Sequence, residues 1–241
     1  MNLVTAFLRS VIYEILRFVI TVIFAVISLL TFPFKPITRY RIITMWSHLV
    51  MGLGRVICGV RYQVVECDNI PQDPCIVLSN HQSAWETLAY QIILPPQVWV
   101  LKRELLRVPF FGWGLAMMSP IAIDRGSSTR ALKQMLEQGR QRLQAGWWIV
   151  VFPEGTRIAP GERGRYHVGG AWLACQSGAT VVPIAHNAGT LWRRNAMVKY
   201  PGTITVSIGP AIDTHGMSPQ TLNQQVENWI ETEVARLGSA R

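Results

Sequence analysis

The chain has 241 residues, of which 49% are hydrophobic and 15% are charged, and 23 Lys and Arg against 14 Asp and Glu give it a net charge of +9. A chain of this length buries a full hydrophobic core without metals or disulfides, and its four cysteines have no paired spacing, which argues against a disulfide framework and predicts a reducing compartment. The positive charge favours anionic partners, but the lack of a long Lys/Arg block and the positive mean hydropathy favour a phospholipid surface over nucleic acid.

The N-terminal region contains an uncharged apolar stretch at residues 18–34. It is marginal for crossing a bilayer, which needs about 20 apolar residues. Basic residues flank it on both sides, so the asymmetry that would orient a spanning helix is missing. We therefore expect residues 3–58 to form two helices, joined by a turn at Pro33 and Pro36, that lie in or dip into the cytoplasmic leaflet. A single short span remains the alternative.

From Arg61 onward, short apolar segments alternate with longer helical patterns, which is typical of a sheet covered by helices. The candidate strands are RYQVVE, CIVLS, QVWVL, PIAI, WWIVVF, ATVVPI and TITVSI. Most are continuous apolar runs, as strands buried on both faces should be, whereas TITVSI alternates like an edge or half-covered strand. Helices are predicted over 84–94, 128–145 and 167–177, and a final helix has Ser218 as its N-cap and Gly238 beyond its end.

These elements predict an α/β fold with a mixed, largely parallel sheet of about seven strands flanked by helices, preceded by an N-terminal membrane-associated two-helix hairpin. The predicted domains are the hairpin at 1–59 and the α/β domain at 60–241. Ligands usually meet such a sheet at the carboxyl ends of its strands. Three loops there carry polar residues: SNHQSAWE, AIDRG and FPEGTR.

His81 and Glu86 in the first of these loops could act together. A histidine takes a proton from a hydroxyl near neutral pH when a partner orients its ring and stabilises the imidazolium. Glu86 could be that partner, but Ser83 to Glu86 also reads S-x-x-E, a capping box in which the acid only accepts a backbone N–H. The residues alone leave both roles open.

The other two loops carry guanidinium groups. In FPEGTR, Gly155 permits a tight turn after a buried strand, and Arg157 offers a fork that could hold a phosphate. Taken alone, this segment is better explained as a surface turn, and Arg125 beside Asp124 as a surface ion pair. Motifs of serine hydrolases, zinc proteases and nucleotide-binding enzymes are missing from the sequence.

The segments NHQSAWE, IDR, FPEGTR and VVPIA, in this order and at these separations, resemble the four sequence blocks of the glycerolipid acyltransferase family, and within it the bacterial 1-acylglycerol-3-phosphate acyltransferases. The resemblance extends over roughly residues 60–210, and the apolar hairpin also resembles the family's membrane anchor.

The resemblance implies that His81 is the general base and Glu86 its orienting acid. It assigns binding of the acceptor's glycerol phosphate to residues of the second and third blocks and to a basic position between the first two: Lys102, Arg125, Glu154, Gly155, Thr156 and Arg157. The fourth block, Val181 to Pro183, would shape the acyl or acceptor pocket. Backbone amides at the start of the helix after Ser83 are candidates to hold the oxyanion, although the sequence does not place these donors. The segment VPFFGWGLAMM at 108–118 could border an acyl tunnel, and ordinary core packing explains it equally well.

The implied reaction moves a fatty acyl group from acyl-CoA or acyl carrier protein to the sn-2 hydroxyl of lysophosphatidic acid, giving phosphatidic acid in phospholipid synthesis. The thioester is a co-substrate, and neither a metal nor another cofactor is implied. The expected partners are the bilayer, the lysolipid and the acyl donor, with no nucleic acid. The expected location is the inner membrane, with the catalytic domain on its cytoplasmic face.

Two departures from the family pattern leave the acceptor open. The family usually has Asp where this chain has Glu86, and many members have a lysine where this chain has RYHVGG, so that Arg165 or His167 would have to replace it. One alternative is an acyltransferase for a different lysophospholipid or a lyso-aminolipid. Another is a membrane lipid-binding protein without catalysis.

Overall fold

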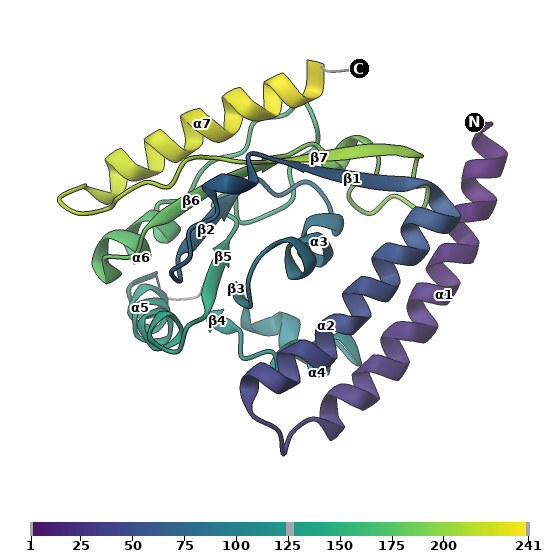
Figure 1. Ribbon diagram of the computed structural model, residues 1–241, viewed down its shortest axis with the longest axis horizontal. Helices are drawn as coiled ribbons and strands as arrows, with labels where there is room; N and C mark the ends of the chain where they lie inside the picture. The colour runs from purple at the N-terminus through teal and green to yellow at the C-terminus, as the bar shows by residue number, and fades with distance from the viewer. Residues whose placement is uncertain (1, 124–127, 240–241) are drawn as a thin grey trace.

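A seven-stranded sheet forms the centre of the computed structural model, which describes residues 2–123 and 128–239 (Figure 1). Its strands are β1 (Val60–Val65), β2 (Ile76–Ser79), β3 (Gln97–Lys102), β4 (Ile121–Ile123), β5 (Trp148–Val151), β6 (Val181–His186) and β7 (Gly202–Ile208). The order is β1-β7-β6-β2-β5-β3-β4, and within the described residues only the β6–β7 pair is antiparallel. The predicted mixed, largely parallel sheet is confirmed.

Helices cover both faces of this sheet, as its buried strands require. One face packs against α3 (Trp85–Ile93) and the N-terminal hairpin, and the other against α5 (Ser128–Gln144), α6 (Gly169–Ser177) and α7 (Pro219–Ser239) (Figure 1). The short α4 (Phe111–Met117) lies against α1. The predicted helices are confirmed to within about two residues.

Two details differ from the sequence-based predictions. The alternating strand β7 lies inside the sheet between β1 and β6, so the edge position, one of its two predicted alternatives, is wrong. The other alternative, a half-covered strand, fits its first half, where Thr203 is exposed while Ile204 is buried. Gly238 was expected beyond the last helix, but α7 continues through Ser239. The N-cap prediction holds, because the Thr221 N–H donates to Ser218 Oγ over 3.1 Å.

The N-terminal hairpin consists of α1 (Leu3–Leu30) and α2 (Pro36–Leu53), followed by one π-helical turn (Gly54–Cys58). In the described part of the chain, α1 is the one helix whose length and composition would allow it to cross a membrane, and only 17% of its most apolar window is buried. Many of its large apolar side chains are exposed: Leu3, Val4, Phe7, Leu8, Ile12, Ile15, Leu16, Phe18, Val19, Ile23, Val26, Leu29 and Leu30. Such a surface indicates association with a membrane.

A buried polar contact fastens α1 to the α/β domain. Lys199, which is 2% exposed, pairs with Glu14 of α1. Its Nζ lies 5.6 Å from the ring centre of Tyr13 and 5.4 Å from that of Trp192. The Lys199 N–H also donates to Ser10 Oγ over 2.9 Å. Because a buried ammonium group needs such partners, the first half of α1 is held against the segment that follows β6.

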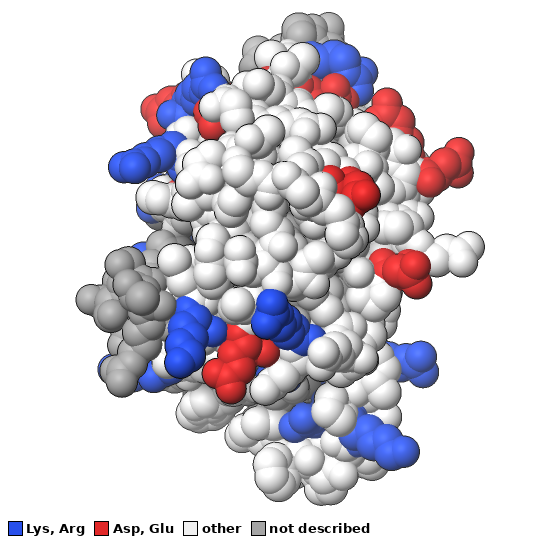
Figure 2. Space-filling model, turned by 90° about the vertical axis from the view of Figure 1, so that its left-hand side faces the viewer, with Lys and Arg blue, Asp and Glu red and all other residues white. Residues whose placement is uncertain are grey.

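The side of the molecule away from α1 has a different character. Figure 2 shows basic and acidic side chains around an uncharged centre on that side. The exposed apolar side chains of the hairpin therefore lie on a different side of the molecule from this charged surface.

Candidate active site

The loops after β2 and β5 meet at one edge of the sheet. The two strands are parallel neighbours, with Ile76 opposite Ile149, so their carboxyl ends lie together. The His81 N–H donates to Glu154 Oε2 over 2.7 Å, and the Ile158 N–H donates to the His81 carbonyl over 2.7 Å. These bonds join the NHQSAWE and FPEGTR segments, as the rule for parallel strands predicts.

His81 and Glu86 form a hydrogen-bonded pair. His81 Nδ1 lies 2.7 Å from Glu86 Oε1. The same oxygen accepts the backbone N–H groups of Gln82 (3.0 Å) and Ser83 (2.8 Å). One carboxylate oxygen therefore caps the start of helix α3 and also holds the ring of His81. The geometry combines the capping role and the histidine-orienting role, both of which the sequence left open.

The surroundings of Glu86 keep it ionised. Burial alone would raise the pKa of its carboxyl, but the hydrogen bond and charge of His81 and the Ser83 N–H together hold this pKa below its usual value. A buried carboxylate in this position can stabilise an imidazolium on His81.

The first amides of this segment are not available to a substrate. The N–H groups of Gln82 and Ser83 donate to Glu86, and the Trp85 N–H donates to Ser83 Oγ over 3.1 Å. Of the amides at the start of the helix after Ser83, that of Trp85 already donates to a side chain of the protein, and the oxyanion role of the other amides there stays a prediction.

The ring of His81 is fixed on a second side by Phe152. The two rings stack with their centres 4.0 Å apart and their planes at 13°. The side chain of His81 is 15% exposed and lines a cavity. Because Nδ1 is bound to Glu86, Nε2 is the ring nitrogen that can take a proton from a substrate hydroxyl.

A buried pair behind this site, Asn80 and His186, was not predicted from the sequence. The Asn80 side chain donates to the His186 carbonyl (2.9 Å) and accepts the His186 N–H (3.0 Å). His186 Nδ1 accepts the Ala188 N–H over 3.2 Å, which places the ring proton on Nε2, 2.9 Å from the Asn80 carbonyl. Burial lowers the pKa of His186, so it is neutral and holds the residue that precedes His81.

Glu154 is buried next to the site and contacts the backbone of His81. It is 7% exposed and is not among the residues that line the cavity. Burial raises the pKa of its carboxyl to about 8, although the hydrogen bond from the His81 N–H opposes this shift. The sequence predicted a substrate contact here, whereas the geometry gives Glu154 a contact with the His81 backbone. Thr156, also predicted to bind substrate, is exposed and lies outside the lining.

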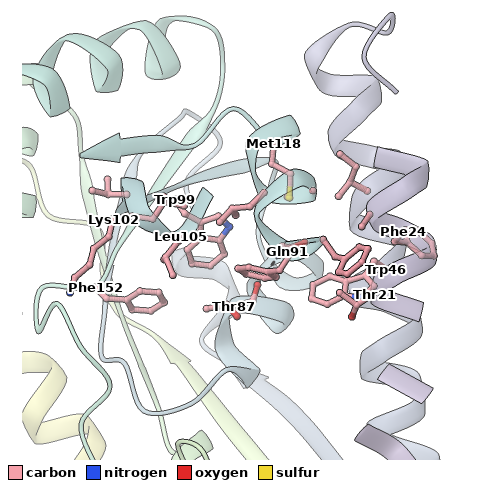
Figure 3. Close-up of a pocket in the computed structure, with 18 of the residues that line it drawn as sticks. Thr21, Phe24, Trp46, Thr87, Gln91, Trp99, Lys102, Leu105, Met118 and Phe152 are labelled. Atoms are coloured by element: carbon pink, nitrogen blue, oxygen red, sulfur yellow. Dashed lines mark hydrogen bonds between the residues drawn. The ribbon is translucent and has the colours of Figure 1, made fainter. Parts of the chain in front are cut away.

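A mostly apolar cavity of about 300 Å³ opens beside His81 (Figure 3). Thr21 and Phe24 of α1 and Trp46 of α2 lie at one end, and Lys102 and Phe152 lie at the other. We call this the acyl cavity, because its shape and apolar walls suit a hydrocarbon chain. Five residues of the 108–118 segment line this cavity, and their contact with an acyl chain stays a prediction: Phe110, Phe111, Gly114, Leu115 and Met118.

Three predicted phosphate contacts lie on the wall of the acyl cavity: Lys102, Gly155 and Arg157. Gly155 has a φ of +68°, which a tight turn at this position requires. Arg157 is partly buried, and its Nε has no hydrogen-bond partner in the described part of the chain. Burial lowers the pKa of this guanidinium, and the charge of Glu86 opposes the shift.

Other predicted contacts lie elsewhere. Arg125 falls outside the described residues. Arg165 and His167 are exposed and do not line the acyl cavity. Val181 to Pro183 are buried within β6 and do not line it either, so the fourth block supports the sheet instead of shaping this pocket.

Comparisons with known proteins identify the family and the fold of this chain. A model of the acyltransferase family matches residues 61–187. A 1-acyl-sn-glycerol-3-phosphate acyltransferase of Pseudomonas aeruginosa is 44% identical over 95% of this chain and 91% of that protein. The human alpha enzyme of the same name is 31% identical over 67% of this chain and 58% of its own length. The crystal structure of the 1-acyl-sn-glycerophosphate acyltransferase from Thermotoga maritima has the same fold, with a TM-score of 0.83, 21% identity, and coverage of 100% of this chain and 99% of that one.

Proposed function

This chain belongs to the acyltransferase family, and on that premise we propose that it transfers a fatty acyl group from a thioester to the sn-2 hydroxyl of 1-acylglycerol-3-phosphate, giving phosphatidic acid. The observation that carries the proposal is the His81–Glu86 pair at the wall of an apolar cavity that also presents Arg157. A base, an anion-binding fork and a hydrocarbon site are what this reaction needs.

In the chemical step, His81 Nε2 takes the proton of the sn-2 hydroxyl while the oxygen attacks the thioester carbonyl carbon. The tetrahedral intermediate then collapses, the C–S bond breaks, and the imidazolium returns the proton to the leaving thiolate. Glu86 stabilises the imidazolium between these two transfers. General base catalysis of this kind contributes about 100- to 10,000-fold to the rate.

Under this proposal Arg157 binds the acceptor's phosphate and Lys102 makes a further contact with the substrate, since both lie on the wall of the acyl cavity. Arg125 keeps its predicted role in the same contact. Both acyl-CoA and acyl carrier protein are suitable donors, because the net charge of +9 attracts the phosphates of the first and the acidic surface of the second. The product enters phospholipid synthesis.

The hairpin holds the enzyme in the cytoplasmic leaflet of the inner membrane. The buried residues of α1 lie toward its two ends, and the domain contacts the helix there through Lys199 and through α4. A helix that crossed the bilayer would have to leave these contacts or take the domain with it. An in-plane helix keeps them and still offers its exposed apolar side chains to lipid.

An assay of thiol release tests the proposal. The purified protein in neutral detergent receives palmitoyl-CoA or palmitoyl carrier protein with lysophosphatidic acid, a zwitterionic lysophospholipid or a phosphate-free monoacylglycerol, and products are identified by mass spectrometry. We expect release that depends on lysophosphatidic acid and is lost in His81→Ala. Faster thiol release with another acceptor would replace lysophosphatidic acid as the proposed substrate. If no lysolipid stimulates thiol release, the protein is better explained as a lipid-binding protein without catalysis.

A further inference from the structure

A second cavity, of about 520 Å³, adjoins the acyl cavity. The two share five lining residues: Thr21, Trp46, Thr87, Phe111 and Arg157. The second cavity is lined by four cationic side chains, Arg17, Arg157, Arg193 and Lys199, and, among the described residues, by one carboxylate, that of Glu14. We call it the cationic cavity.

Glu14 compensates only part of this positive charge. It accepts two hydrogen bonds from Arg17 and also pairs with Lys199. The exposed side chain of Arg193 has no hydrogen bond or ion pair with any residue that the structure describes, and Arg157 Nε is buried without a partner there. Two guanidinium groups on the wall of one cavity are therefore available to an anion.

The backbone around Arg193 is held in place beside Arg157. Trp192, which is 5% exposed, packs edge-on against Tyr13 of α1, with ring centres 5.3 Å apart. Arg194 Nη1 donates to the backbone carbonyl of Arg157 over 2.8 Å. Both neighbours of Arg193 are thus anchored, one to the hairpin and one to the FPEGTR turn, and this reduces the entropy lost when Arg193 binds a ligand.

We propose that Arg193 determines the headgroup specificity of this enzyme by binding, together with Arg157, the phosphate monoester of the acceptor in the cationic cavity. The inference rests on the proposed function. A phosphate monoester carries a charge of about −1.5 to −2 at pH 7 and three acceptor oxygens, which suit two guanidinium forks. A phosphodiester headgroup carries one charge and a substituent on one of those oxygens, so it offers the two guanidinium groups less charge and fewer free acceptor oxygens. With the phosphate in the cationic cavity, the glycerol lies at the junction with the acyl cavity, which His81 lines.

The test compares Arg193→Gln with Arg61→Gln, which removes the same charge from an exposed position on β1 that lines neither cavity. We expect Arg193→Gln to raise KM for lysophosphatidic acid about tenfold to a hundredfold with little change in kcat, as loss of a hydrogen bond to a charged group does. Arg193→Lys, which keeps the charge but not the fork, gives an intermediate KM. In the wild type, KM falls as pH rises through the second pKa of the phosphate, about 6, and this dependence weakens in Arg193→Gln.

The outcomes separate this inference from the proposed function. Acylation of lysophosphatidic acid by the wild type, with a KM in Arg193→Gln equal to that in Arg61→Gln, would overturn the role of Arg193 alone. An equal loss of activity toward monoester and diester lysolipids, accompanied by a lower unfolding temperature, would also overturn it, because a structural role predicts that result. No acylation of lysophosphatidic acid by the wild type would overturn the proposed function and this inference with it.

Discussion

At the scale of single residues, Glu86 Oε1 accepts three hydrogen bonds, two from the backbone and one from His81. Glu86→Gln keeps an oxygen for the backbone amides but removes the negative charge that an imidazolium needs. We expect kcat to fall about 100- to 10,000-fold. The new amide N–H₂ replaces Oε2, which is buried without a partner among the described residues, so the free energy of unfolding should fall by no more than about 3 kcal/mol. Steady-state rates and thermal unfolding measure the two effects.

Glu86→Asp is the companion variant, because Asp is the usual residue of the family at this position. Its side chain is one methylene shorter, so on the present backbone it cannot keep all three hydrogen bonds, and we expect lower activity together with lower stability. Wild-type activity in Glu86→Asp would show that the backbone adjusts. Near-normal turnover in Glu86→Gln would leave Glu86 as a helix cap only.

Glu154 gives a pH dependence whose sign can be stated. Its pKa rises from the ordinary 4.5 to about 8 in the folded protein, so between these values the folded state holds a proton that the unfolded state has lost. This group therefore lowers stability as pH rises from about 4.5 to 8. Glu154→Gln cannot ionise and keeps a carbonyl oxygen for the His81 N–H, so its denaturation midpoint should fall less over this range than that of the wild type.

A substrate role for Glu154 makes a different prediction. If this carboxyl bound the acceptor, Glu154→Gln would raise KM for lysophosphatidic acid, whereas a supporting role leaves KM within about threefold of the wild type, because the neutral amide still holds the His81 backbone. If the denaturation midpoint changes equally with pH in the wild type and in Glu154→Gln, Glu154 is ionised in the folded protein at neutral pH.

Contacts between residues that lie close along the chain could be predicted from the sequence. His81 and Glu86 are five residues apart at the start of a helix, so their pairing follows from local geometry. Asn80 and His186 are separated by 106 residues, and no local pattern indicates that they meet. The contact of Glu154 with the His81 backbone depends in the same way on β2 and β5 being neighbours.

At the scale of elements, strand positions were predicted well because most strands are apolar runs bounded by turns. β2 and β5, for example, are buried at every position. Strand order is decided by tertiary packing, which an alternating pattern does not reveal. Strand β7 alternates like an edge strand, because Thr203 is exposed and Ile204 is buried, yet it lies inside the sheet. For the same reason, helix α1 could be predicted while its contact with Lys199 could not.

Helix α4 offers a test of the acyl cavity. A Cβ on Gly114 would lie 3.6 Å from Ser28 Oγ, so a side chain fits there and narrows the space between α4 and α1. Each methylene displaced from an apolar site costs about 0.8 kcal/mol, so Gly114→Val should lower kcat/KM for a palmitoyl donor about tenfold and leave an octanoyl donor within about twofold.

Ala116→Val is the matched control, since Ala116 lies on the same helix but is exposed and does not line the cavity. The control should leave both donors unchanged. An equal loss for short and long chains in Gly114→Val would place the acyl chain elsewhere.

At the scale of the whole molecule, the docking of α1 along the domain predicts that both ends of this helix face the same side of the membrane. We expect a membrane-impermeant maleimide to label Asn2→Cys and Lys35→Cys in inverted vesicles and not in right-side-out ones, each variant in a Cys67→Ser background. Cys67, exposed on the α/β domain, marks the cytoplasmic side in the otherwise unchanged protein. Labelling of the two positions from opposite sides would establish a spanning helix.

The acyl cavity takes one of its walls from the hairpin, through Thr21, Phe24 and Trp46. If, as proposed, this helix pair rests in the lipid and encloses the reacting chain, the activity of the enzyme depends on the lipid composition of the membrane around it. Turnover should then follow the mole fraction of lysolipid in the bilayer, so that dilution with inert lipid slows the enzyme even when the amount of substrate per volume of buffer is constant.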